Sequence, residues 1–234
     1  MKTLKMSIVM FLSLTSLLVS AQNLGDKKER FDNKYAVVTG KQQLKKDIHQ
    51  LEVFKKKIIA FEEAFIGHET KRVNLLKADI LSDMKREIKQ SERKINQNRV
   101  ELKQSKIELR NSKRELKRTK RNALRRNTVQ NRKELRDEKR DTKDDRRDLR
   151  DDKRDLETQI ARTNRQKEIY KKIKAFNFSN IKASGKRKLM TNSKLLNDFA
   201  KTMEADITAT KIELKEDFKE MNEDRIERRE NLRS

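Results

Sequence analysis

The residues best suited to chemistry in this chain are lysines and arginines, and they gather in its middle. Residues 96–131 hold twelve Lys or Arg against three Glu, and the chain as a whole carries a net charge of +24. A dense row of cations attracts anionic polymers, lipid headgroups and acidic proteins over long distances. We therefore predict a polyanion- or partner-binding surface, with a solvated helix face as the alternative reading. The predicted binding surface consists of Lys103, Lys106, Arg110, Lys113, Arg114, Lys117, Arg118 and Arg121.

This surface lacks the groups that read a nucleic acid sequence. No Phe, Tyr or Trp occurs between Phe65 and Tyr170, so unpaired bases have no aromatic side chain to stack on. Contacts to a nucleic acid would reach phosphates only, and they would weaken steeply with salt. Sequence-specific nucleic acid binding is not expected.

Groups for catalysis are also missing from the sequence. The two histidines, His49 and His68, stand outside any cluster with metal-ligand spacing, and the chain has no cysteine. The motifs GxSxG, GxxxxGK[ST] and GxGxxG do not occur. The pairs Asp144-Asp145 and Asp151-Asp152 are typical of salt-bridged helix faces rather than of cation sites. We predict no catalytic, cofactor or metal site, and a protein that is not an enzyme.

Composition predicts an all-α fold. The 234 residues include no proline and only four glycines, and 43% of them are charged. Globular folds of this length contain far more turn residues. Disordered chains are rich in Pro, Ser and Gly and lack sustained heptads. Here Leu81, Ile88, Ile95, Leu102, Leu109 and Leu116 recur every seven residues, which indicates a coiled coil.

Glycines suggest where the helices end. We predict an irregular segment at 22–40, a helix at 41–66, a turn at Gly67-His68, and one central coiled-coil helix at 69–176 of about 100 residues. A loop at 177–186 leads to a C-terminal helix at 187–232 that packs antiparallel on 130–176. The expected fold is thus an elongated antiparallel coiled coil, a long central helix with a shorter helix folded back at each end. In this arrangement residues 96–131 have no partner within the chain.

A second repeat predicts how the C-terminal helix would align. Residues 136–156 hold acidic and basic stripes whose like charges lie three and four residues apart, which disfavours a solitary helix. Pairing this segment with the C-terminal helix at a residue sum of 363 sets opposite charges against each other. The alternatives are a coincidence of repeats, or the same pairing between chains. The predicted charge zipper consists of Arg136, Lys143, Arg147, Arg150, Glu213, Glu216, Glu220 and Glu227.

The first 21 residues have the layout of a secretory signal peptide. Lys2 and Lys5 precede a mostly apolar stretch, and Val19-Ser20-Ala21 offers small residues before a cleavage point. The apolar stretch is too short for a transmembrane anchor. We predict an exported bacterial protein, periplasmic or extracellular, with no transmembrane span.

The combination of a signal peptide, basic charge, the short segment Tyr35-Ala36-Val37-Val38 and long helical arms resembles the Skp/OmpH periplasmic chaperones. That family folds as trimers whose helical tentacles hold unfolded outer-membrane proteins, so the resemblance implies a holdase chaperone. This chain lacks the later strands that close the family's β body, and no residue roles carry over.

The leading functional hypothesis is a non-enzymatic coiled-coil protein that acts as a scaffold, spacer or adaptor in the cell envelope or outside the cell. The alternatives are a Skp-like holdase and a basic polyanion-binding protein. The expected partners are acidic proteins, anionic envelope components and the chain itself, which could form a homo-oligomer through Leu102, Leu109 and Leu116.

Overall fold

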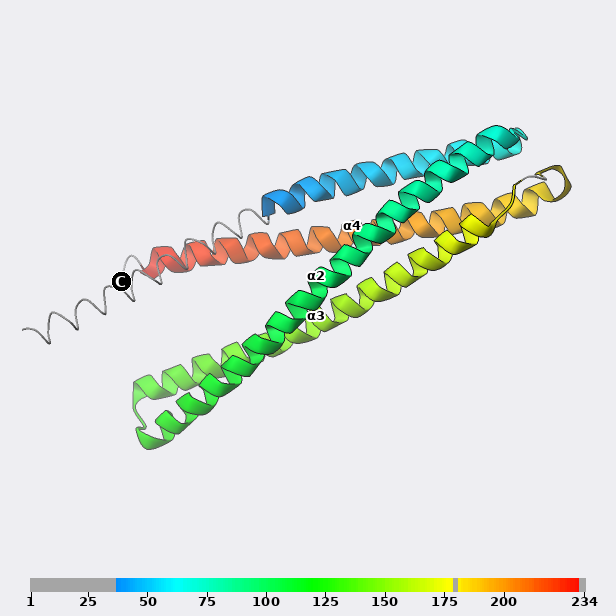
Figure 1. Ribbon diagram of the computed structural model, residues 1–234. Helices are drawn as coiled ribbons and strands as arrows, with labels where there is room; N and C mark the ends of the chain where they lie inside the picture. Colours follow the sequence, from blue (N-terminus) through cyan, green and yellow to red (C-terminus); the bar gives the residue numbers. More distant parts are fainter. Residues whose placement is uncertain (1–36, 179–180, 232–234) are drawn as a thin grey trace, which may run out of the picture. The chain divides into compact units, whose positions relative to one another are not determined.

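The computed structural model describes residues 37–178 and 181–231, and these residues are almost entirely helical (Figure 1). A first helix covers residues 37–66 and is followed by α2 (Thr70–Arg125), α3 (Val129–Ala175) and α4 (Ile181–Asn231). The all-α prediction is confirmed, since no strand occurs within these two ranges. Residues 37–40, predicted to be irregular, are helical. The predicted signal peptide and the rest of 22–40, with Tyr35 and Ala36, lie outside the described residues.

The turn between the first helix and α2 is made by Gly67 and His68. His68 has a φ of 56°, in the left-handed region that ends many helices. The amide of Gly67 donates to the carbonyl of Glu63, and the amide of Glu69 donates to the carbonyl of Ala64. These bonds satisfy carbonyls that the end of the helix would leave unpaired.

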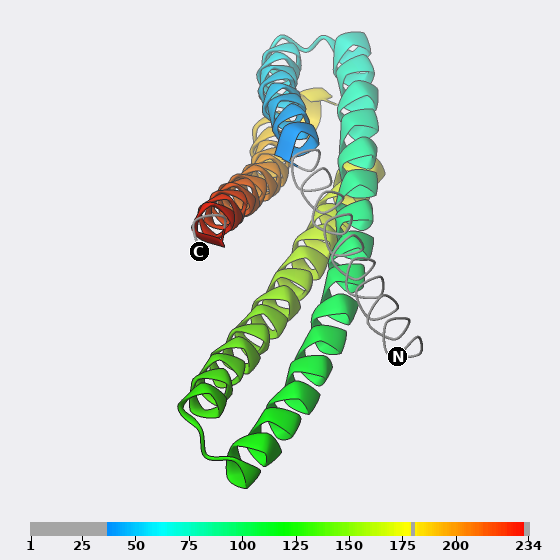
Figure 2. The same ribbon diagram turned by 90° about the vertical axis from the view of Figure 1, so that its left-hand side faces the viewer.

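The predicted single helix over 69–176 is wrong. The chain leaves the helix at Arg126, and α3 begins at Val129 and runs back along α2 as an antiparallel hairpin. Figures 1 and 2 show the two helices side by side from two directions. No partner within the chain was expected for residues 96–131, but residues 96–125 of α2 pair with α3.

The helix breaks here without glycine or proline because two local signals coincide. The apolar heptad of α2 ends at Leu116, and the heptad of α3 starts again at Leu135, 19 residues later and out of phase. A continuous helix would carry these two stripes on different faces. Thr128 then caps α3, its hydroxyl accepting from the amide of Asn131 at 3.1 Å.

Removing this cap should weaken the hairpin. We expect Thr128→Ala to lower the free energy of unfolding by about 1 kcal/mol, since one amide of the first turn loses its partner. The measurement is chemical denaturation followed by circular dichroism. Thr158→Ala, an exposed position in the middle of α3, is the control and should cost less than 0.5 kcal/mol, about the size of an ordinary surface substitution. Equal losses in both variants would contradict a capping role.

The helices form two compact units, and each is described by itself. The larger unit is Phe54–Thr202, and the smaller unit combines Met1–Val53 with Met203–Ser234. At one end of the larger unit the last turns of the first helix, both ends of the hairpin and the start of α4 enclose an aromatic core. Phe54 packs on Phe199 with ring centroids 5.5 Å apart, and Phe61 packs on Phe178 at 5.3 Å.

Ion pairs join neighbouring helices at the edge of this core. Lys57 of the first helix binds Asp83 of α2 at 2.6 Å, and Arg165 of α3 binds Asp198 of α4 at 3.3 Å. Beyond this end, only α2 and α3 continue together within the larger unit, and they form the two-helix hairpin that carries the charge repeats. The hairpin is therefore anchored at its base within the larger unit.

In the smaller unit, residues 37–53 pack antiparallel against the later part of α4. A Cβ atom built on Gly40 would meet the Cδ2 atom of Leu214 at 2.5 Å, so the leucine side chain lies directly against the glycine. Lys41 lies over the ring of Phe218 at 5.5 Å. Met203 and Ile207 are buried and supply most of the described apolar core.

Candidate binding face on the hairpin

The register of the hairpin is fixed by three contacts across its seam. Ser105 donates to Asp152 and Ser112 donates to Asp145, each through its hydroxyl. Farther toward the core, Glu92 and Lys167 form an ion pair of 2.7 Å. The three contacts agree in register, so the heptads of α2 and α3 stay aligned along the whole hairpin.

Two rows from each helix form the seam. The α2 rows are Leu102, Leu109, Leu116 and Ser105, Ser112, Thr119, and the α3 rows are Thr142, Leu149, Leu156 and Glu138, Asp145, Asp152. All twelve side chains are buried or half-buried. Five of the twelve are leucines and the other seven are polar, among them the two serine–aspartate pairs. Such a seam holds register well and contributes little apolar burial.

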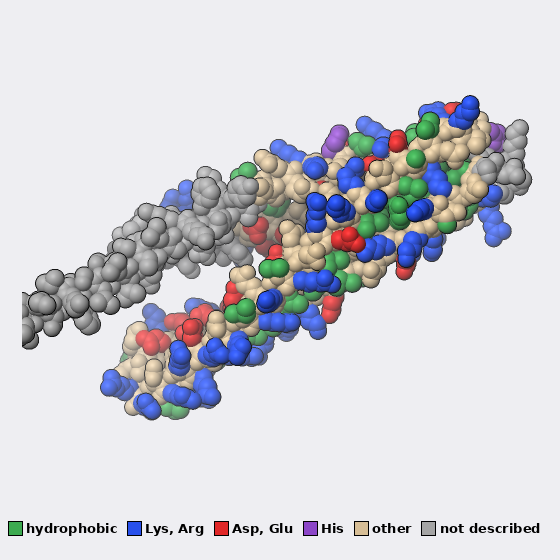
Figure 3. Space-filling model, in the orientation of Figure 1, with side chains coloured by type: hydrophobic (Ala, Val, Ile, Leu, Met, Phe, Trp, Pro, Cys, Tyr) green, Lys and Arg blue, Asp and Glu red, His purple; other side chains and the backbone are tan. Residues whose placement is uncertain are grey.

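Cations occupy one flank of this seam from Lys103 to Lys120 of α2 and from Arg136 to Lys153 of α3, where Lys153 pairs with Glu157 at 3.8 Å. We call this flank the basic face; it consists of Lys103, Lys106, Arg110, Lys113, Lys117 and Lys120 of α2 with Arg136, Lys139, Lys143, Arg146, Arg150 and Lys153 of α3. All twelve are exposed, and no acidic residue stands among them. Figure 3 shows Lys and Arg side chains following the hairpin. The field of these charges is directed at solvent, where a partner could bind.

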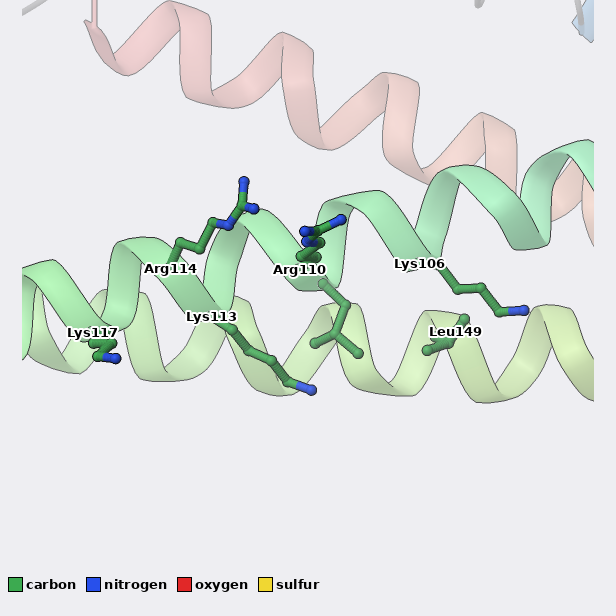
Figure 4. A pocket seen from close by; sticks show the side chains of 7 residues that line it. Lys106, Arg110, Lys113, Arg114, Lys117 and Leu149 are labelled. Atoms are coloured by element: carbon green, nitrogen blue, oxygen red, sulfur yellow. The ribbon is translucent and has the colours of Figure 1, made fainter.

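A shallow groove of about 350 Å³ lies on the basic face. Leu109 and Leu149 contribute its apolar floor, and five cations surround it: Lys106, Arg110, Lys113, Arg114 and Lys117. In Figure 4, Lys106 and Lys113 point toward α3, whereas Arg114 points away from it. Within the described residues no ion pair joins any of these five cations to a carboxylate. Their charge is therefore available to an anion from outside the chain.

The opposite flank of the seam is acidic. We call it the acidic face; it consists of Glu101, Glu108 and Glu115 of α2 with Asp141, Asp148 and Asp155 of α3. At the outer edge of α3, carboxylates are partly neutralised by arginines three residues later, as in the pairs Asp144–Arg147 and Asp151–Arg154, both at 3.1 Å. The hairpin is thus two-sided, with opposite charge on its two faces.

Partial burial, and after it the neighbouring carboxylates, raise the pKa of two acidic groups on this side of the hairpin. Partial burial raises the pKa of Asp148 above its ordinary value of 3.8, and the neighbouring aspartates, Asp145 first, raise it further. The pKa of Glu138 is raised above 4.5 by partial burial and then by Glu115 and Asp141. Both carboxyl groups therefore bind a proton more readily in the folded hairpin than in the unfolded chain.

This shift predicts a hairpin that gains stability on mild acidification. A carboxyl with a raised folded pKa contributes stability below its unfolded pKa and loses that contribution as pH rises through the folded value. Lowering pH from 7 toward 4, close to the ordinary pKa values of 4.5 and 3.8, should therefore raise the unfolding temperature, measured by circular dichroism. The variant E138Q/D148N should be more stable at pH 7 and less sensitive to pH. Asp79→Asn, which changes an exposed carboxylate outside the seam, should leave the pH profile unchanged, and an unfolding temperature that falls on acidification would contradict the mechanism.

Five of the eight predicted binding residues meet in the groove: Lys106, Arg110, Lys113, Arg114 and Lys117. Lys103 continues the basic face one turn earlier. By heptad position Arg118 lies on the acidic side, and Arg121 lies on the outer edge of α2. Sequence reasoning assigned Arg136, Lys143 and Arg150 to the charge zipper instead, and it missed the other members of the basic face and its groove: Lys120, Lys139, Arg146, Lys153 and Leu149. Finding the phase slip between Leu116 and Leu135 would have brought these residues together.

The predicted charge zipper divides between the two units. Arg136, Lys143, Arg147 and Arg150 belong to the larger unit, where their helix pairs with α2, and Arg147 binds Asp144 of its own helix. Glu213 and Glu216 belong to the smaller unit, and the side chains of Glu220 and Glu227 lie outside the described part. The zipper stays a prediction. The like-charged stripes predicted a partner helix for this segment, and the helix that pairs with it in the structure is α2.

Comparisons with known proteins add no function. No family model matches the chain, and no curated protein or solved structure matches it either. Among the described residues, no group of three or more His, Cys, Asp or Glu could hold a metal ion. None of the described helices is both long enough and apolar enough to span a membrane. What the chain offers is a charged, grooved helical surface.

Proposed function

We propose that this chain is an exported, non-enzymatic coiled-coil adaptor that holds an anionic polymer or surface against the basic face of its hairpin. The observation that carries the proposal is the groove, where five exposed cations surround Leu109 and Leu149 and form no ion pair with a carboxylate of the described part of the chain. An adaptor needs an anchored element that presents charge without internal neutralisation. The base of the hairpin, tied down by the aromatic core, supports that role.

The geometry favours an extended anion over a compact one. The α2 half of the basic face runs from Lys103 to Lys120, and at 1.5 Å per residue it is about 26 Å long. Its cations follow one another at spacings of three and four residues, so they form a continuous row along the helix axis. A linear anionic polymer lying along that row can contact several cations at once, and each contact releases a bound counterion.

Salt dependence tests the proposal directly. With heparin as the probe, five groove contacts at about 0.7 counterions each predict a slope of about −3.5 in a plot of log affinity against log salt. Raising salt from 50 to 200 mM should then weaken binding about 100-fold, measured by fluorescence anisotropy. Uncharged dextran of the same length is the control ligand and should not bind. Heparin binding that is unaffected by salt would refute the proposal.

A further inference from the structure

The hairpin carries like charges across both flanks of its own seam. Glu92 and Lys167 fix which flanking residues face each other. Counting in heptads from that pair along both helices places Lys106 beside Lys153 and Lys113 beside Arg146 on the basic face. On the acidic face the same register places Glu108 beside Asp148 and Glu115 beside Asp141. An antiparallel pair selected only for its own stability would carry opposite charges at these positions.

The change from attraction to repulsion along the hairpin is abrupt. Near the aromatic core, Glu92 and Lys167 attract each other across the seam. Two heptads later, at Lys106 and Lys153, the same flank carries cations on both helices. The outer hairpin therefore sets like charges against each other on both flanks of its seam, and Glu115 and Glu138 repel each other across it. On the acidic face Arg140 and Arg154 partly neutralise Asp141 and Asp155, at 4.0 and 3.9 Å.

The two faces share one repeat. Cations of the basic face and carboxylates of the acidic face both recur every seven residues, or about 10.5 Å of helix. The acidic face of a second hairpin therefore presents its charges at the spacing of the cations on the first. A second copy of the chain matches this repeat by construction, whereas few other partners would match it on both faces.

We propose that hairpins of this protein stack on one another, the basic face of one copy against the acidic face of the next. The contact joins two different surfaces, so it leaves a free face at each end and the stack grows open-ended rather than closing as a symmetric dimer. The inference uses the basic face defined above but does not rest on its binding a polymer. A polyanion would compete with stacking for the same cations.

Two charge-reversal variants test the stack. K106E/K113E removes cations from the basic face, and E108K/E115K removes carboxylates from the acidic face. Each creates opposite-charge pairs across the seam of its own hairpin, so both variants should fold and should unfold at a higher temperature than the unmodified chain. Unfolding temperature by circular dichroism checks this before any assembly is measured.

Sedimentation velocity of the chain without residues 1–21 then gives the decisive result. At 20 mM salt the unmodified chain should form species that grow with concentration, and 500 mM salt should disperse them. Each variant alone should assemble at least 10-fold more weakly. An equimolar mixture should form dimers, because the intact acidic face of K106E/K113E fits the intact basic face of E108K/E115K. An unmodified chain that stays monomeric at 20 mM salt, or a mixture without dimers, would overturn the stack.

Heparin separates this inference from the proposed adaptor function. The variant E108K/E115K keeps its whole basic face, so it should bind heparin at least as tightly as the unmodified chain while it fails to assemble. Heparin added to the unmodified chain at 20 mM salt should shorten the stacks. Loss of heparin binding with intact assembly would reject the adaptor proposal alone.

Discussion

Replacing the five groove cations by glutamine should lower the affinity for heparin more than 100-fold at 50 mM salt. The variant is K106Q/R110Q/K113Q/R114Q/K117Q, and each change removes a charge while keeping a long side chain with good helix propensity. If each contact contributes about 0.6 kcal/mol, within the range for exposed charge pairs, five contribute about 3 kcal/mol. The slope of log affinity against log salt should also become about 3.5 shallower.

A control with the same loss of net charge distinguishes the groove from general attraction. Five exposed cations elsewhere in the larger unit serve this purpose: Lys56, Lys71, Lys172, Arg187 and Lys194. Glutamine at these positions should weaken heparin binding less than 10-fold, since only the overall field changes. Equal losses in both variants would show that net charge, and not the basic face, determines binding.

The all-α class could be predicted from the sequence because proline is absent and glycine is rare. A chain without proline offers few places to stop a helix, and the heptads from Leu81 to Leu116 give the helix a buried stripe. The first turn was readable as well, since Gly67 ends the apolar pattern of the preceding helix. Local signals of this kind act over a few residues and need no knowledge of the partner.

The hairpin turn was missed because its signals are weak. Arg126 to Thr128 contain neither glycine nor proline, and Thr128 is a common residue that caps a helix only in the right context. A phase slip of the heptads was the stronger signal. It becomes visible only when Leu116 and Leu135 are counted in one register, across a stretch where charged residues hide the pattern.

The error in the turn carried over to the predicted site. Cations of α2 were found because they are dense in the sequence, whereas their α3 neighbours are mixed with an equal number of acids over 132–157. The antiparallel pairing of α2 with α3 decides on which flank each of these charges lies. It places Lys139 and Arg146 on the basic face and Asp141 on the acidic face. Net charge alone cannot show segregation of this kind, because it is a property of the folded pair.

The largest losses of stability should come from the aromatic core at the base of the hairpin. Phe54 is 1% exposed and Phe199 is fully buried, and their ring centroids lie 5.5 Å apart. Truncation of either ring to alanine should lower the free energy of unfolding by about 3–5 kcal/mol, since it removes buried apolar surface and leaves a cavity. Chemical denaturation followed by circular dichroism measures the loss.

Two further variants test whether this aromatic packing stabilises the base of the hairpin. Phe199→Leu keeps most of the volume and should cost less than about 1.5 kcal/mol, so it stays measurable even if the alanine variants do not fold. Phe218→Ala removes a half-exposed ring of the smaller unit that contacts Lys41, and it should cost about 1 kcal/mol. The base of the hairpin depends on this aromatic packing because the seam beyond it buries few apolar side chains. A cost at Phe199→Ala no larger than at Phe218→Ala would mean that the hairpin is held by its charged seam instead.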